Sequence, residues 1–237
     1  MGALRREYAG DIQFARSKRG VALEKGSWRL FAGVDLFTLW LFGAWSLYVV
    51  LVYPSVAALA APFSRVLAEG IRFFILAAPA MFLIYGVRST LRLGPLGPAL
   101  KAGALVSLAW IAGSAAFGLT LQGLSLSTAK LDLVFWLTTF SVSCLSEEIA
   151  FRGTLLRGWL ELGRRWAIPV SALCFVFIHV PGWIVRNIFS SPLEWVITPA
   201  SIFILGLVIG WLYTRYRSIW PGVMLHAANN LAAAVLV

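Results

Sequence analysis

The chain has 237 residues, of which 60% are hydrophobic and only 13% are charged. A soluble domain usually has about a quarter of its residues charged, so this composition excludes an ordinary soluble domain and indicates a protein embedded in a lipid bilayer. The net charge of +10 lies mainly between apolar segments, where basic residues orient helices, so we expect no nucleic-acid partner.

The chain begins with a basic segment, 1–30, which contains seven Lys or Arg residues and no apolar run. We predict that it is a cytoplasmic segment and not a cleavable leader. Seven apolar segments follow, and most approach the length of about 20 residues that a transmembrane helix needs. They lie at 31–53, 71–87, 102–124, 132–151, 166–185, 195–214 and 219–237. The sequence therefore predicts an all-α, polytopic transmembrane helical bundle of about seven spans.

The distribution of Lys and Arg predicts the orientation of this bundle. With a cytoplasmic N-terminus, sixteen basic residues fall in inner segments and four in outer segments, namely Arg65, Arg72, Lys130 and Arg186. Cytoplasmic loops carry the excess of basic residues in membrane proteins. We therefore expect an integral protein of the cytoplasmic membrane, or an equivalent inner membrane, with its N-terminus in the cytoplasm.

Ionisable residues inside a bilayer cost about 2.5–3.5 kcal/mol each on insertion scales and usually serve a function. In this chain they gather in the last four apolar segments, together with a pair of asparagines: Glu147, Glu148, Arg152, His179, His226, Asn229 and Asn230. We therefore predict that 131–237 forms a four-helix catalytic core and that 31–130 forms three accessory transmembrane helices.

Helix geometry brings these polar residues to one level of the bilayer. If the fourth and fifth segments form an antiparallel hairpin, a turn at Gly163 places Glu147 and His179 at the same depth. The fourth helix can extend that far, because good helix formers follow residue 151 and no breaker precedes Gly163. Residues four apart on a helix share a face, so Glu148 lies beside Arg152 on the fourth helix.

The same spacing pairs His226 with Asn230 on the last helix. A carboxylate beside a histidine can activate water as a general base. A second histidine with an asparagine one turn on can donate hydrogen bonds to an oxyanion. Together these groups favour peptide-bond hydrolysis without a covalent intermediate.

Other interpretations stay open at this point. Glu148 and Arg152 could form an intrahelical ion pair that only helps insertion, and the asparagines could hold helices together. That interpretation explains the second glutamate poorly, because only one carboxylate can pair with Arg152. A His₂Glu zinc site built from His179, His226 and a glutamate is a second alternative, although no HExxH motif is present. Cys144 as a nucleophile is a third.

Three motifs in order on successive apolar segments resemble those of the CAAX prenyl protease and bacteriocin-processing (CPBP) family. Glu147-Glu148-x-x-x-Arg152 resembles its EExxxR motif, Phe175-x-x-x-His179 its second motif, and His226-x-x-x-Asn230 its third. The resemblance covers about 131–237. It implies an all-helical glutamate-dependent protease without a metal cofactor, in which Glu147 and His179 activate water. Glu148 and Arg152 would support them, and His226 and Asn230 would form the oxyanion site.

The resulting prediction is an intramembrane endopeptidase that cuts a membrane-associated protein or peptide, such as a lipid-modified chain or one with a C-terminal sorting signal. Its partners would be that substrate and the bilayer, and the sequence sets no oligomeric state. Two competing functions are a non-catalytic membrane immunity or binding protein on the same scaffold, and a transporter that uses the carboxylates as a proton relay.

Overall fold

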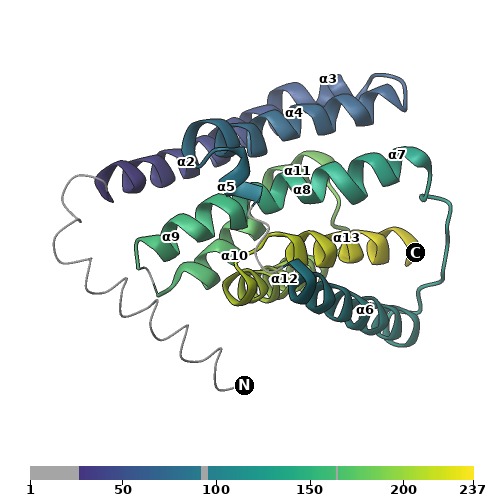
Figure 1. Cartoon of the computed structure of the whole chain (residues 1–237). Helices are drawn as coiled ribbons and strands as arrows, with labels where there is room; N and C mark the ends of the chain where they lie inside the picture. The colour runs from purple at the N-terminus through teal and green to yellow at the C-terminus, as the bar shows by residue number, and fades with distance from the viewer. Residues whose placement is uncertain (1–26, 92–95, 164) are drawn as a thin grey trace, which may run out of the picture.

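The computed structural model describes residues 27–91, 96–163 and 165–237, and the basic segment 1–30 lies mostly outside these residues. Its regular structure is helical (Figure 1), and within the described residues the only β-pairing is an isolated bridge between Leu126 and Leu236. The predicted all-α class is therefore confirmed.

Six helices of the described chain are long and apolar enough to cross a membrane: Ala32–Ala57, Phe63–Ile84, Leu96–Leu121, Leu133–Glu161, Ala167–Arg186 and Glu194–Tyr216. Many large apolar side chains on their outer faces are exposed, including Leu39 and Leu83 at 71% and 82%. Exposed apolar surface on this scale suits contact with lipid and not with water. The protein is therefore an integral membrane protein with a polytopic helical bundle.

The first three spans are built as follows. The first consists of α2 (Ser27–Leu47), a π-helical stretch η2 (Tyr48–Val52) and α3 (Tyr53–Ala57). The second consists of α4 (Phe63–Pro79) and η3 (Ala80–Ile84), and the short α5 (Val87–Leu91) follows it. The third is α6 (Leu96–Leu121).

The fourth span is one long helix that changes its winding several times. It runs through α7 (Leu133–Phe135), η4 (Trp136–Ser143), α8 (Cys144–Glu148), η5 (Ile149–Leu156) and α9 (Arg157–Glu161). The helix ends before Gly163, whose φ of +73° suits a glycine at a helix C-terminus. The predicted extension beyond residue 151 and the turn at Gly163 are both confirmed. The five-residue α8, which carries both glutamates, lies between two π-helical stretches, a winding that occurs mostly as short bulges at functional sites.

The fifth span breaks at its histidine. It consists of α10 (Ala167–Phe177) and α11 (Val180–Arg186), and His179 lies between them. Pro181 is near the start of α11; a proline has no backbone N–H and disfavours helical backbone in the residue before it, so the helix cannot continue unbroken. The carbonyl of Ile178 at this break accepts a hydrogen bond of 2.7 Å from Trp45 Nε1 of α2.

The last two helices are α12 (Glu194–Tyr216) and α13 (Trp220–Val235), and Arg217 between them has a left-handed φ of 52°. At 16 residues, α13 extends about 24 Å, which is less than the about 30 Å of a bilayer core. The seventh predicted span is therefore a helix, but it is shorter than the six full spans.

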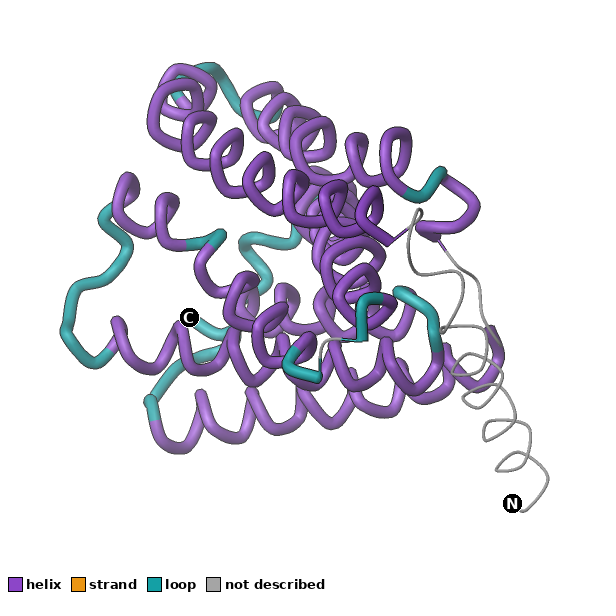
Figure 2. The backbone as a smooth tube through the Cα atoms, turned by 90° about the vertical axis from the view of Figure 1, so that its left-hand side faces the viewer, coloured by secondary structure: helices purple, strands orange, loops and turns teal. Residues whose placement is uncertain are grey.

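The fourth span lies between two groups of helices (Figures 1 and 2). α2 and α4 pack on one side of it, while α13 packs on the other and also contacts α6 and α12. This arrangement places side chains from α4, α8, the α10–α11 break and α13 around one buried region.

Candidate active site

A buried ion pair and a histidine fix the carboxylate of Glu148. Oε1 of Glu148 accepts hydrogen bonds of 3.1 Å from Nη1 of Arg152 and 3.1 Å from Nδ1 of His226. Arg152 also donates to the carbonyl of Gly206 at 3.4 Å, and its guanidinium carbon lies 4.4 Å from the ring centre of Phe175. Glu148 and Arg152 are completely buried, so the predicted i,i+4 pair is present and is shielded from solvent.

Glu147 lies between a second arginine and the same histidine. Its Oε1 is 3.7 Å from Nη1 of Arg72 on α4, and its Oε2 is 3.7 Å from Nε2 of His226. The sequence argument that only one of the two glutamates has a cationic partner is therefore wrong, because Arg72 supplies a second one. His226 bridges the two carboxylates, with one ring nitrogen facing each.

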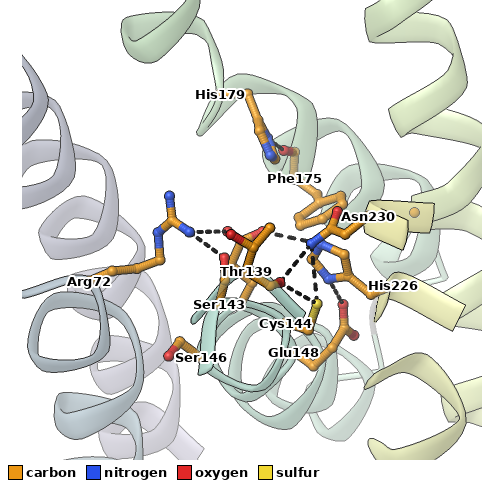
Figure 3. Close-up of polar contacts among 12 residues, drawn as sticks. Arg72, Thr139, Ser143, Cys144, Ser146, Glu148, Phe175, His179, His226 and Asn230 are labelled. Carbon is orange, nitrogen blue, oxygen red and sulfur yellow. Dashed lines mark hydrogen bonds and ion pairs between the residues drawn. The ribbon is translucent and has the colours of Figure 1, made fainter. Parts of the chain in front are cut away.

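His179 faces the site from the other side of Phe175. Its Nδ1 lies 2.7 Å from the carbonyl oxygen of Phe175, which can only accept, so Nδ1 donates and the neutral ring has its free acceptor at Nε2. The ring of Phe175 lies edge-on to both imidazoles, with centroid distances of 5.2 Å to His179 and 5.4 Å to His226. Figure 3 shows His179 beyond Phe175, farther from the Glu148 carboxylate than His226 is.

Asn230 contacts the fourth helix and not the glutamates. Its Nδ2 donates to the carbonyl of Thr139 at 3.1 Å and to Sγ of Cys144 at 3.3 Å (Figure 3). A hydrogen bond from Asn230 to a substrate oxygen would therefore replace one of these two contacts. Asn229, next to it, accepts a bond of 3.1 Å from Trp110 Nε1 and so joins α13 to α6.

Several buried polar atoms at the site have unused hydrogen-bonding capacity. Within the described residues, Oε2 of Glu147, Oε2 of Glu148 and Nε of Arg152 are buried and have no hydrogen-bond partner. Buried polar atoms are nearly always satisfied in folded proteins, and exceptions call for an explanation. A carboxylate oxygen with free lone pairs suits the binding and deprotonation of water, and each of the two glutamates has one.

A cavity of about 440 Å³ adjoins this cluster, within the about 300–1,000 Å³ typical of ligand sites. Side chains from the first two spans form much of its wall, and η4 and α11 complete it: Trp45, Tyr48, Val49, Tyr53, Ala57, Ser64, Arg65, Ala68, Glu69, Arg72, Thr138, Thr139, Gly182 and Arg186. Arg72 belongs both to this wall and to the contacts of Glu147. Arg72 therefore separates the cavity from Glu147, which is not among the residues that line it.

Arg72 and Glu69 are site residues that the sequence pattern did not predict. The second apolar segment was expected to begin at 71, which left Arg72 at an outer loop. In the structure Arg72 lies nine residues after Phe63 in a span that ends at Ile84, about 14 Å along the helix. The signal was the short second segment, which becomes a full span once the Glu69-x-x-Arg72 pair is included.

The described residues contain no group of three His, Cys, Asp or Glu side chains placed to hold a metal ion. Both ring nitrogens of His226 instead face glutamate oxygens.

Comparison with known proteins identifies the C-terminal part. Residues 128–232 match the family model described as type II CAAX prenyl endopeptidase, Rce1-like. No curated protein and no solved structure matches the chain. The match covers all three motifs and agrees with the resemblance to CAAX proteases. Residues 128–232 are therefore similar to the Rce1-like family of CAAX-type intramembrane proteases.

Proposed function

We propose that this protein is a glutamate-dependent intramembrane endopeptidase that hydrolyses a peptide bond of a membrane-associated substrate. The observation that supports it most directly is the pair of adjacent carboxylates, Glu147 and Glu148, buried beside His226 with one oxygen of each free of hydrogen bonds within the described chain.

In the proposed reaction, Glu147 accepts a proton from a water molecule while that water attacks the carbonyl carbon of the substrate. His179 orients the same water through its free Nε2. The C–N bond then breaks, and the proton passes to the leaving amine. Glu148 acts through His226: Arg152 holds the Glu148 carboxylate, which fixes the ring of His226 so that its Nε2 faces the reacting region. In this proposal no metal ion takes part.

The oxyanion of the tetrahedral intermediate needs donors close to Glu147. His226 and Asn230 are the candidates from α13. His226 donates from Nε2 only when that nitrogen carries a proton, and Asn230 donates only after it releases Thr139 or Cys144. We propose that substrate binding brings about this exchange at Asn230.

The test uses the full chain in liposomes with fluorogenic peptides that have free C-termini, half of them carrying a prenylated cysteine. We expect cleavage by the parent protein and a loss of about 100- to 10,000-fold in kcat for Glu147→Gln, which is the usual contribution of a general base. His179→Ala should also lose most activity. Equal cleavage by parent and Glu147→Gln would overturn the role of Glu147 as the base, and no cleavage of either peptide set by the parent would favour a non-catalytic immunity or binding protein. The two peptide sets separate a requirement for prenylation from hydrolysis itself.

A further inference from the structure

Arg72 has more partners than a helix-insertion ion pair needs. Its Nη1 lies 3.0 and 3.1 Å from the two carboxylate oxygens of Glu69 and also donates to the hydroxyl of Ser143. The same nitrogen lies 3.7 Å from Oε1 of Glu147. A pair with Glu69 alone, three residues away on α4, would offset the free-energy cost of placing the Arg72 charge within the bilayer.

The position of Arg72 is fixed from three elements. Glu69 holds it from its own helix, Ser143 holds it from η4, and the ring of Trp45 on α2 lies 5.2 Å from its guanidinium carbon. Trp45 in turn donates to the carbonyl of Ile178 at the break beside His179. Arg72 therefore connects the first two spans to Glu147 and, through Trp45, to the segment that carries His179.

The two glutamates have parallel arrangements. Glu148 has Arg152 at 3.1 Å, and Glu147 has Arg72 at 3.7 Å. Arg152 lies within the residues that match the family model, whereas Arg72 lies far outside 128–232. The catalytic cluster is therefore incomplete without α4, a helix that the sequence placed among accessory spans.

We infer that Arg72 is a positioning residue for Glu147, held in place by Glu69 and Ser143, so that the N-terminal helices form part of the active site. This inference rests on the proposed function of Glu147 as the general base. Arg72 touches neither water nor substrate in this role: it fixes the direction of the carboxylate, leaving Oε2 to face the reacting region.

The test compares Arg72→Gln with Arg157→Gln in the liposome assay. Arg157 is a matched control because it is also a mostly buried arginine in an intrahelical pair, 2.8 Å from Glu161, and it lies about 15 Å along the helix from Glu147. We expect Arg72→Gln to lower kcat about 10- to 100-fold with KM within about threefold, since small misplacements of a catalytic group have such effects. Arg157→Gln should keep kcat within about twofold of the parent.

Conservative replacement and chemical rescue distinguish positioning from a purely structural role. Arg72→Lys should recover part of kcat, because a point charge remains. Adding guanidinium ion to Arg72→Ala should raise kcat, whereas the same ion should leave the kcat of Arg157→Ala unchanged. Equal loss of kcat in Arg72→Gln and Arg157→Gln, or no response of Arg72→Ala to guanidinium, would overturn the inference while leaving the proposed function intact.

A stability measurement decides the inference even if no peptide is cleaved. In detergent micelles, the melting temperatures of Arg72→Gln, Glu147→Gln and the double variant form a thermodynamic cycle. We expect the double variant to lose less stability than the sum of the two single losses, because each single variant already removes the interaction between Arg72 and Glu147 and the double variant removes it only once. Strict additivity would show that Arg72 and Glu147 do not interact and would refute the positioning role.

Discussion

Gly222 tests how closely α13 packs against the glutamates. A Cβ at this position would lie 2.6 Å from Cγ2 of Ile209 and 2.9 Å from Oε2 of Glu148, whereas carbon atoms in contact prefer about 3.5–4.0 Å. Glu148 cannot retreat freely, because Arg152 and His226 both hold its other oxygen. For Gly222→Ala we therefore expect overpacking that costs about 1–3 kcal/mol of unfolding free energy.

The same substitution should also reduce activity. To relieve the contact, α13 or the Glu148 carboxylate has to move by a large part of an ångström, and a displacement of about 1 Å at a catalytic site can lower the rate about 100-fold. We expect kcat to fall about 10- to 100-fold, because His226 moves with α13. Peptide cleavage in liposomes measures this loss, and thermal unfolding in micelles measures the loss of stability.

Gly113→Ala provides the control for this experiment. Gly113 lies within α6 and an added Cβ there meets nothing within 4 Å. Alanine favours a helix over glycine by about 0.8–1.0 kcal/mol, so this variant should be at least as stable as the parent and equally active. If Gly222→Ala matched Gly113→Ala in both measurements, the close approach of α13 to Glu148 would be refuted.

Three further variants test other parts of the site. Arg152→Gln should lose about 3–5 kcal/mol of unfolding free energy, because Glu148 stays buried without its cation. The double variant Glu148→Gln/Arg152→Gln should lose less than Arg152→Gln, because no unpaired charge stays buried. A loss of unfolding free energy in the double variant equal to the sum of the losses in Glu148→Gln and Arg152→Gln would contradict this pairing. Ala68→Phe, which fills the cavity, should raise KM at least about tenfold, equivalent to 1.4 kcal/mol of binding, whereas Val66→Phe at a 53% exposed position on the same helix should not. Trp45→Phe should cost about 1–3 kcal/mol in thermal unfolding by leaving the buried carbonyl of Ile178 unpaired, more than Trp40→Phe, whose bond to Ile75 is exposed.

Much of the fold could be predicted because the bilayer demands long apolar helices. The fifth and sixth spans lie within one or two residues of their expected ranges, and Gly163 ends a helix where the turn was expected. The second span was placed too late, since Arg65, Glu69 and Arg72 interrupt its apolar run. The π-helical stretches around α8 carry no such signal, because their residues are ordinary helix formers and the winding depends on packing against neighbouring helices.

The candidate site could be predicted only in part. A spacing of four residues pairs Glu148 with Arg152 within one helix. The position of the turn at Gly163 predicts that Glu147 on the fourth span and His179 on the fifth span lie at the same depth in the bilayer. Spacing within a helix says nothing about which other helix faces Glu147, so the contributions of Arg72 and Trp45 could not be predicted. The detailed contacts of Asn230 depend likewise on how α13 packs against η4.

The charges of the cluster give a physical reason for combining both halves of the chain in one site. Three carboxylates, from Glu69, Glu147 and Glu148, meet two guanidiniums, from Arg72 and Arg152. A net buried charge is costly in a low-dielectric environment, and Arg72 lowers the net negative charge of this set from two to one. In the proposed hydrolysis, a carboxylate of this set takes a proton from water at attack, and that proton passes to the leaving amine at bond cleavage. Without Arg72 the larger negative charge would favour protonated carboxylates, and a protonated carboxylate cannot act as a base; for this reason we expect α4 to be as necessary to the proposed reaction as the helices that carry the motifs.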